Sequence, residues 1–293
     1  MTAYLDPVNR AFADTASQGV PVYTKPFREA RDVLESIQKH DPAKDIRVEE
    51  LNIPVKTGNV KTYIYRPVAA DAKHQLPVIF YTHGGGWILG SPHAHELLVE
   101  DLARLANAAV VFPYYTPAPE KQYPVQFEES YGALEHIVKN GNKHNLVADR
   151  LALAGDSVGH MAIALTQLAQ SRKPYLSEKT MDWMIDAFLP NPEDRRQALT
   201  SPLAYTPDEV LAKFPPTTIF VSGVDPLIAE GEEFGQRLQK AGVDVAILKA
   251  EGQIHDYVLL EPVRKSATAR AVVELAALKL GQAISQGYEK VKA

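Results

Sequence analysis

Cysteine is absent from this sequence of 293 residues. The protein therefore has no disulfide bond, no thiolate metal site and no cysteine nucleophile, and the absence fits a reducing compartment. Long apolar runs are missing as well. No segment reaches the length that spans a bilayer, and the first residues, MTAYLDPVNRAFADTASQGV, lack the apolar core of a signal peptide. From these absences we expect a soluble cytoplasmic protein without stable membrane insertion.

An excess of positive charge is also lacking. The formal net charge at pH 7 is −5, the isoelectric point is near 6.0, and no polybasic run occurs. Nucleic-acid and membrane-surface partners require a basic patch, so we expect neither. Hydrophobic residues make up 45% and charged residues 23% of the chain, an ordinary globular composition that allows a core enclosing a pocket.

Strand and helix patterns alternate along most of the chain. Residues 25–40 carry a helical apolar spacing, and two β patterns around the KTGN turn at 56–59 predict a hairpin. Strand patterns follow, each with a helical pattern behind it, and the first is a continuous apolar run; these strand patterns are 76–83, 109–116, 150–157, 217–225 and 244–252. The alternation predicts an α/β fold with a mostly parallel central sheet flanked by helices.

Four segments are expected from these patterns. Residues 1–45 form an N-terminal helical cap segment, 46–174 the first part of the core, 175–205 a second, proline-punctuated cap segment, and 206–293 the second part of the core. No internal repeat or low-complexity tract divides the chain further.

Ser157 stands in the pentapeptide GDSVG, between an apolar run and a helical pattern. In a G-x-S-x-G elbow the glycines permit a sharp turn that lifts the serine hydroxyl clear of the sheet, at a helix N-terminus that favours negative charge. A serine at this place can also simply cap the helix. The strand–turn–helix context favours a nucleophile over a cap.

The stretch HGGGW runs from His83 to Trp87, directly after the apolar run at 76–83. Three successive glycines let backbone N–H groups turn toward a ligand. At this place in an α/β hydrolase they donate to an oxyanion, together with the N–H after the serine, that of Val158. A dinucleotide loop would need glycine where Leu89 stands, and a P-loop would need a following Lys-Ser/Thr pair. A glycine-rich turn without a ligand is the remaining alternative, and it is costly to order.

Asp225 and His255 follow Ser157 in the chain order Ser…Asp…His of α/β hydrolases. Each comes at the C-terminal end of a predicted strand, at the edge where open α/β sheets bind ligands. Either residue could instead make a local turn or cap. Asp256 is a rival acid, but we expect its side chain to point away from the adjacent imidazole. Asp156 is too close to Ser157 to orient a histidine.

Three other histidines are interpreted as structural. His93 and His95 form an H-x-H pair without a third ligand at suitable spacing, so we predict no metal site and a helix-start or surface role. His160 lies about one helical turn after Ser157, where a helix holds it along its own surface, and we favour a packing or polar role for it.

Together these motifs resemble the hormone-sensitive-lipase-like branch of the α/β-hydrolase esterases. The resemblance runs from about residue 76 to the end of the chain and rests on HGGGW, YYTPAPEKQYP (114–124), GDSVG, SGVDPLIAEGE (222–232) and IHDY (254–257). It implies short-to-medium acyl esters as substrates and no cofactor. The residues it implies are Ser157, Asp225 and His255 as the catalytic triad, Gly85, Gly86 and Val158 as the oxyanion hole, and Trp87 and Asp156 at the substrate pocket.

The sequence departs from this family at two places. His160 stands where the family has a second glycine after the elbow, and AQSRKP runs straight into YLSEKT where the family has a further strand and loop. Either the natural chain carries residues that this sequence lacks, or the sheet is rebuilt. In the second case we expect the neighbouring strands to re-pair about 4.8 Å closer to each other. An intact mass near 32.3 kDa would exclude the first explanation.

We therefore predict a serine carboxylesterase in which His255 takes the proton of Ser157 and Asp225 orients the imidazole. Two alternatives stay open. A non-catalytic protein could bind a small ligand in a hydrolase pocket, which the missing strand favours, and the same triad could hydrolyse amides or lactones. The expected partner is a small-molecule ester, and the sequence leaves a homodimer open.

Overall fold

The computed structural model describes residues 4–68, 75–160 and 175–286. The chain divides into two compact units. Residues 34–160 and 273–293 form the five-stranded unit, and residues 1–33 and 161–272 form the two-stranded unit. Helices α2 (Phe27–Ile37) and α9 (Ala267–Gln286) contribute residues to both units.

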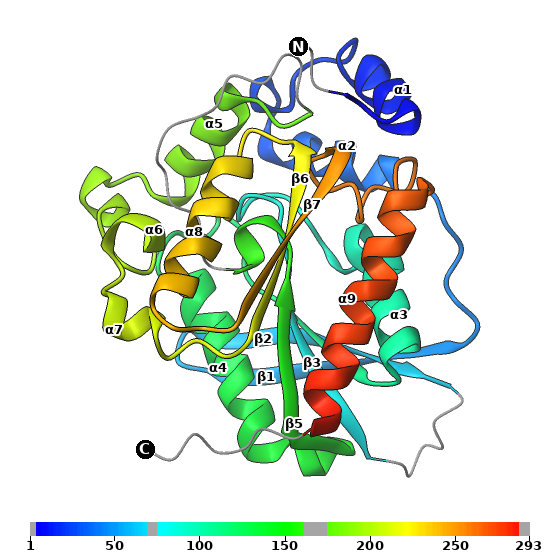
Figure 1. The fold of residues 1–293 in the computed structure, drawn as a ribbon, viewed down its shortest axis with the longest axis vertical. Coiled ribbons are helices and arrows are strands. Elements are labelled where there is room, and N and C mark those ends of the chain that lie inside the picture. Colours follow the sequence, from blue (N-terminus) through cyan, green and yellow to red (C-terminus); the bar gives the residue numbers. More distant parts are fainter. Residues whose placement is uncertain (1–3, 69–74, 161–174, 287–293) are drawn as a thin grey trace. The chain divides into compact units, whose positions relative to one another are not determined.

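A mixed sheet with the strand order β1-β2-β4-β3-β5 forms the centre of the five-stranded unit (Figure 1). Its strands are β1 (Ile46–Val55), β2 (Gly58–Pro67), β3 (Leu76–Thr82), β4 (Ala109–Tyr114) and β5 (Leu146–Gly155). β1 and β2 form the predicted antiparallel hairpin, and β2 also pairs antiparallel with β4. β3 runs parallel to both β4 and β5. The parallel sheet predicted from the apolar runs is therefore extended by an antiparallel hairpin.

Alternate side chains of the central strand β3 face two helix layers. Phe80 belongs to a buried cluster that includes Ile137 of α4 (Val125–Asn140). Tyr81 points to the opposite face, where its ring lies 6.3 Å from that of His95 in α3. The strand is buried on both sides, as its continuous apolar run predicts. The helices of this unit are α3 (Pro92–Ala106), α4 (Val125–Asn140), η2 (Gly141–His144) and η3 (Ser157–His160).

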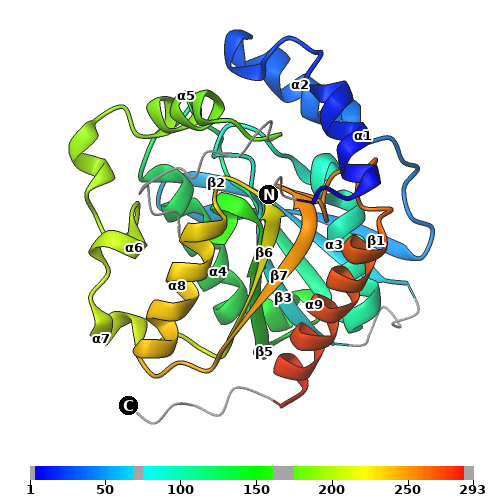
Figure 2. The same ribbon diagram turned by 45° about the horizontal axis from the view of Figure 1, so that its top comes forward.

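The two-stranded unit contains the parallel strands β6 (Thr217–Val224) and β7 (Val245–Ile254). Their C-terminal ends are level, because Val224 is paired with Ile254. Helix α8 (Ile228–Lys240) joins the two strands and packs along both (Figure 2). The other helices are α1 (Pro7–Ala16), η1 (Val22–Thr24), α5 (Glu178–Phe188), η4 (Pro192–Arg195), α6 (Pro202–Tyr205) and α7 (Asp208–Leu211).

The strand that the sequence lacks between Arg172 and Tyr175 falls on residues 161–174, which lie outside the described residues. In the described part of the chain, β5 has only β3 as a strand neighbour, and β6 has only β7. The expected re-pairing would join β5 to β6, which belong to different units, so it stays a prediction. Leu153, within β5, is 58% exposed.

Helices occupy much of the two segments predicted as a cap, 1–45 and 175–205. Their assignment to a cap stays a prediction. None of the described helices combines the length and the apolarity needed to cross a membrane.

Candidate active site

Ser157 lies at a sharp turn directly after β5. Its φ is 47°, in the left-handed region that non-glycine residues rarely adopt. Gly159 permits the tight turn, because a Cβ at this position would overlap the carbonyl group of Thr82 at the end of β3. The Thr82 hydroxyl donates a hydrogen bond to the Gly159 carbonyl oxygen. The backbone there has the strained strand-to-helix turn that a nucleophile elbow requires.

The glycine-rich loop after β3 presents unpaired backbone donors. Gly85 and Gly86 have φ values of 102° and 63°, and the Gly85 carbonyl oxygen accepts from the N–H of Leu89 at 2.8 Å. A Cβ at Gly85 would overlap that Leu89 backbone, so only glycine fits. None of the described residues accepts a hydrogen bond from the N–H groups of Gly85, Gly86 or Val158. These groups are therefore free to donate to a ligand.

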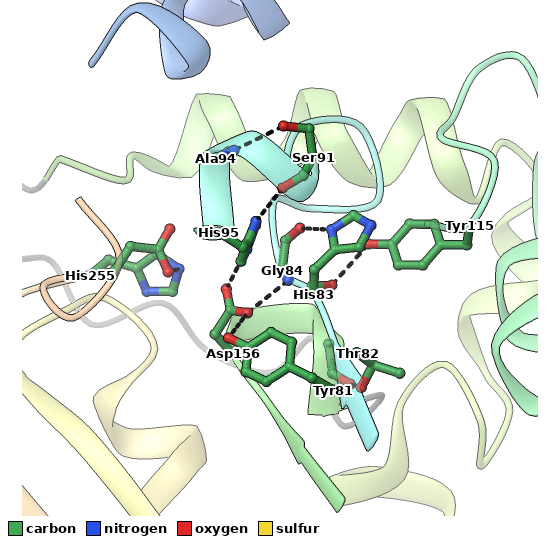
Figure 3. A network of polar contacts seen from close by, with 12 residues as sticks. Tyr81, Thr82, His83, Gly84, Ser91, Ala94, His95, Tyr115, Asp156 and His255 are labelled. Carbon is green, nitrogen blue, oxygen red and sulfur yellow. Dashed lines mark hydrogen bonds and ion pairs between the residues drawn. The ribbon is translucent and has the colours of Figure 1, made fainter. Parts of the chain in front are cut away.

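The Asp156 carboxylate connects the elbow to the glycine-rich loop (Figure 3). It accepts hydrogen bonds from the Tyr81 hydroxyl at 2.6 Å and from the N–H of Gly84 at 3.0 Å. Its other oxygen lies 3.4 Å from Nε2 of His95. Burial raises the pKa of Asp156, but the charge and hydrogen bond of His95 and the Tyr81 hydroxyl outweigh it, and the pKa is lowered overall. A negative charge is thus fixed between the two backbone segments.

His95 is fully buried on α3, and each of its ring nitrogens faces an acceptor. Nδ1 lies 3.0 Å from the carbonyl oxygen of Ser91, and Nε2 faces the Asp156 carboxylate. A doubly protonated imidazolium satisfies both acceptors. His95 lies in the first turn of α3, which agrees with the expected helix-start role, but its burial contradicts the alternative of a surface role. Its helical spacing to Leu98 and Val99, both buried, is the sequence signal that could have identified an inward histidine.

His83 also contacts the glycine-rich loop. Its Nδ1 donates to the Gly84 carbonyl oxygen at 2.8 Å, and its ring stacks on Tyr115 with the centroids 4.0 Å apart. The Tyr115 hydroxyl donates to the His83 carbonyl oxygen at 3.0 Å. Burial, reinforced by the charge of His95, lowers the pKa of His83 to about 3. The ring is therefore neutral and serves as a rigid support for the glycines.

In the two-stranded unit, Asp225 and His255 lie directly after the level ends of β6 and β7. Nδ1 of His255 is 2.7 Å from Oδ2 of Asp225, and both residues are buried. The other carboxylate oxygen accepts from the N–H of Leu227 at 2.9 Å. Burial raises the pKa of Asp225, but the charge and hydrogen bond of His255 and the Leu227 N–H outweigh it and lower the pKa overall. The carboxylate is therefore ionised and holds the Nδ1–H tautomer of the imidazole.

Asp256 does not point away from the imidazole as expected. Its Oδ1 lies 3.5 Å from Nε2 of His255. The physical reason is backbone conformation: Asp256 has a φ of 60°, and its carbonyl oxygen accepts from the N–H groups of Leu259 and Leu260, which turns the chain back. The contact of His255 with Asp225, at 2.7 Å, is shorter than its contact with Asp256, and the two carboxylates face different ring nitrogens.

Asn9 of α1 was not identified from the sequence, although it holds the backbone that leads to His255. The residue is fully buried, and its Oδ1 accepts from the N–H of Ile254 at 2.9 Å. Its Nδ2 donates to Oε1 of Gln253 at 3.0 Å, and that oxygen also accepts from the Ser266 hydroxyl. No local sequence signal marks this role, because the partners are far away in the chain.

The predicted site residues are distributed over both units. Ser157, Val158 and the glycine-rich loop belong to the five-stranded unit, whereas Asp225 and His255 belong to the two-stranded unit. Trp87 is buried, with a φ of 61°, and its carbonyl oxygen accepts from the N–H of Ala118. The side chain of His160 lies outside the described part of the structure.

Comparison with known proteins gives relatives along nearly the whole chain. A family model described as alpha/beta hydrolase fold matches residues 79–174 and 169–259. The two matches overlap at residues 169–174, close to the place where the sequence departs from the family. An esterase of Gibberella moniliformis is 46% identical over 312 residues, with 94% of this chain and 96% of that protein covered. Because this alignment is longer than the 293-residue chain, the relative has residues within it that this chain lacks.

Two solved structures share the fold over almost their full length. A thermostable esterase from Pseudomonas putida ECU1011 is 28% identical, with a TM-score of 0.91 and coverage of 97% of this chain and 99% of that one. Carboxyl esterase 2 from the fungus Tuber melanosporum is 32% identical, with a TM-score of 0.87 and coverage of 95% and 99%.

Proposed function

The chain belongs to the hormone-sensitive-lipase-like branch of the α/β-hydrolase esterases and is a carboxylic ester hydrolase, and on this premise we propose that it hydrolyses short-to-medium acyl esters through an acyl-enzyme on Ser157. His255 is the general base and Asp225 orients it. The N–H groups of Gly85, Gly86 and Val158 bind the oxyanion. No cofactor takes part in the proposed reaction.

In the proposed reaction, Oγ of Ser157 attacks the ester carbonyl carbon while Nε2 of His255 takes the hydroxyl proton. A new C–O bond forms, and the carbonyl oxygen becomes an oxyanion that the three backbone donors stabilise. The bond to the alcohol then breaks, and the alcohol leaves with the proton from His255. Water attacks the acyl-enzyme by the same route, which releases the carboxylic acid and restores the serine.

The contact between Asp225 and His255 is the observation that carries this proposal. Because Nδ1 donates its proton to the ionised carboxylate, the lone pair of the neutral ring lies on Nε2, and this nitrogen can accept a proton. The left-handed φ of Ser157 and the unpaired donors of the glycine-rich loop support the other two roles.

We assign the control of substrate size to the helical segments. In this proposal, residues 1–45 and 175–205 form a cap that limits the acyl chain, and Trp87 lies near the mouth of the pocket. Asp156 is also assigned to the pocket region, but its three protein partners favour a positioning role over direct contact with substrate. A pocket closed by helical segments accommodates small and medium esters more readily than long lipid chains.

Replacement of Ser157 by alanine tests the proposal. We expect Ser157→Ala to abolish hydrolysis of p-nitrophenyl esters and labelling by a fluorophosphonate probe, with an unchanged circular dichroism spectrum. A series of acyl lengths, together with an anilide and a lactone, tests the substrate class. Retained esterase activity in the variant would refute the role of Ser157, and a preference for the anilide or the lactone would refute the ester assignment.

A further inference from the structure

His40, His93 and Glu96 come together on the five-stranded unit, although the sequence places them in two separate segments. His40 lies in the connection between α2 and β1, and the other two lie on the first turns of α3. One ligand atom from each of the three side chains lies within 4.8 Å of the others. His93 and Glu96 are three residues apart, so both project from the same face of the helix. The cluster thus has the form of a preassembled ligand set.

The distances match those of a small metal site. Nδ1 of His40 is 3.5 Å and Nδ1 of His93 is 3.8 Å from the same oxygen, Oε2 of Glu96. Ligands about 2.05 Å from a tetrahedral zinc ion are separated from each other by about 3.4 Å. Small rotations of the side chains would therefore bring the three atoms to bonding distance of one ion, and a fourth position would stay open to water.

His40 provides an independent observation that points to a ligand. Its side chain is only 8% exposed, and among the described residues neither ring nitrogen has a hydrogen-bond partner. Buried polar atoms are nearly always hydrogen-bonded, so a buried imidazole that has no hydrogen-bond partner needs an explanation. A metal ion between His40 and Glu96 would supply the missing interaction.

A second carboxyl lies near Glu96. Glu100 lies one helical turn after Glu96, and its Oε1 accepts from the N–H of Ala43, near His40 in the chain. Burial raises the pKa of Glu100 and the charge of Glu96 adds to this effect, whereas the Ala43 N–H and the charges of Arg104 and His40 lower it. Glu100 is therefore a partly desolvated carboxyl that Glu96 repels. A bound divalent ion would relieve the repulsion between the two carboxylates.

We propose that His40, His93 and Glu96 bind one zinc-class divalent ion. Two imidazoles and one carboxylate are the donor set that zinc and cobalt accept, whereas magnesium and calcium prefer oxygen ligands. The ion would fasten the connection after α2 to the start of α3. The proposed ligand set also explains why the H-x-H pair did not indicate a metal site in the sequence. His95 turns inward to Asp156, and the ligands that join His93 are His40 and Glu96.

Metal-free protein titrated with ZnCl₂ tests this inference by calorimetry and by thermal unfolding. We expect one Zn²⁺ per chain and a higher Tm in its presence, because a ligand that binds only the folded state stabilises it. His93→Gln and Glu96→Gln each remove a ligand at an accessible position and should weaken Zn²⁺ binding at least tenfold. Replacement of Zn²⁺ by Co²⁺ should give a visible absorption band in the wild-type protein that both variants lose.

A second histidine pair supplies the control. The rings of His136 and His144 lie 6.0 Å apart in the same unit and are not part of this ligand set. His136→Gln should therefore bind Zn²⁺ as the wild-type protein does. The proposal is overturned if the wild-type protein binds no stoichiometric Zn²⁺, or if both His93→Gln and Glu96→Gln keep the wild-type affinity.

Discussion

The side chain of Asn9 accepts a hydrogen bond from the backbone N–H of Ile254 at 2.9 Å, across 245 positions of the sequence. Ile254 immediately precedes His255, the proposed base. The N–H of Asp6 also donates to the carbonyl oxygen of Gly252. Asp6 and Asn9 thus make two hydrogen bonds to the backbone at the end of β7. The N-terminal helix therefore helps to position the imidazole without touching it.

Asn9→Ala should lower both stability and activity. The substitution leaves the buried Ile254 N–H without its acceptor and removes one of the two donors to Gln253 Oε1, which costs about 2 kcal/mol of unfolding free energy. We expect kcat/KM to fall at least about tenfold, because the base loses its fixed position. Asp14→Ala, at an exposed site of the same helix, is the matched control in urea unfolding and in ester hydrolysis. Equal behaviour of the two variants would contradict the positioning role.

The contact between Asp156 and His95 predicts that substitutions of these two residues have non-additive effects on the free energy of unfolding. Asp156→Asn keeps an oxygen for the Tyr81 hydroxyl but removes the charge that faces the buried imidazole. Loss of one partner from a buried pair typically costs about 3–5 kcal/mol, whereas loss of both costs less than the sum. We therefore expect a double-mutant cycle of Asp156→Asn and His95→Gln to give a coupling energy of about 1 kcal/mol or more. Simple additivity in unfolding experiments would show that the two side chains do not interact.

The lowered pKa of Asp225 predicts the shape of the pH profile. The carboxylate stays ionised well below the pH at which an ordinary imidazole gains its proton, about 6.5. The acid limb of kcat/KM should therefore follow one protonation, that of His255, with a slope of one. A slope of two would indicate that the carboxylate titrates in the same range.

Asp225→Asn separates orientation from binding. The variant cannot hold the Nδ1–H tautomer by a charged acceptor, and we expect kcat to fall by about 10⁴-fold, as in other triads, with a small change in KM. Asp256→Asn is the matched control, because that carboxylate is the rival acid and lies near Nε2 instead. A larger loss in Asp256→Asn than in Asp225→Asn would reverse the assignment of the acid.

Local sequence signals were sufficient for the strands and for the places where they end. The apolar run of β3 is buried on both faces, and β6 and β7 end directly before Asp225 and His255. Parallel neighbours in one sheet bring such residues together, so the contact between them could be anticipated. The order of the motifs along the chain likewise indicated the family.

Other features depend on information that no local pattern contains. The partners of Asn9 are set by tertiary packing, and the orientation of Asp256 depends on one left-handed dihedral angle. The ligands that join His93 come from a distant segment and from a helical neighbour three residues on, so the spacing in SPHAHE could not indicate them. His95 is intermediate, because its helical spacing to buried apolar residues was visible and was outweighed by the H-x-H pattern.

The buried His83 predicts a loss of stability in mild acid. Burial lowers its pKa in the folded protein to about 3, whereas the unfolded chain takes up the proton near about 6.5. Between these values the unfolded state binds more protons than the folded state, so the unfolding free energy falls as the pH decreases. From pH 7 to pH 5 this one group contributes a loss of about 2 kcal/mol.

His83→Phe isolates this contribution, because phenylalanine keeps the stacking on Tyr115 but cannot take up a proton. At pH 8, where the histidine is neutral in both states, the variant should be less stable than the wild type, since it loses the hydrogen bond to the Gly84 carbonyl oxygen. The difference should shrink by about 2 kcal/mol when both proteins are unfolded by urea at pH 5. A difference that stays constant between pH 8 and pH 5 would show that the imidazole is protonated in the folded protein as readily as in the unfolded chain.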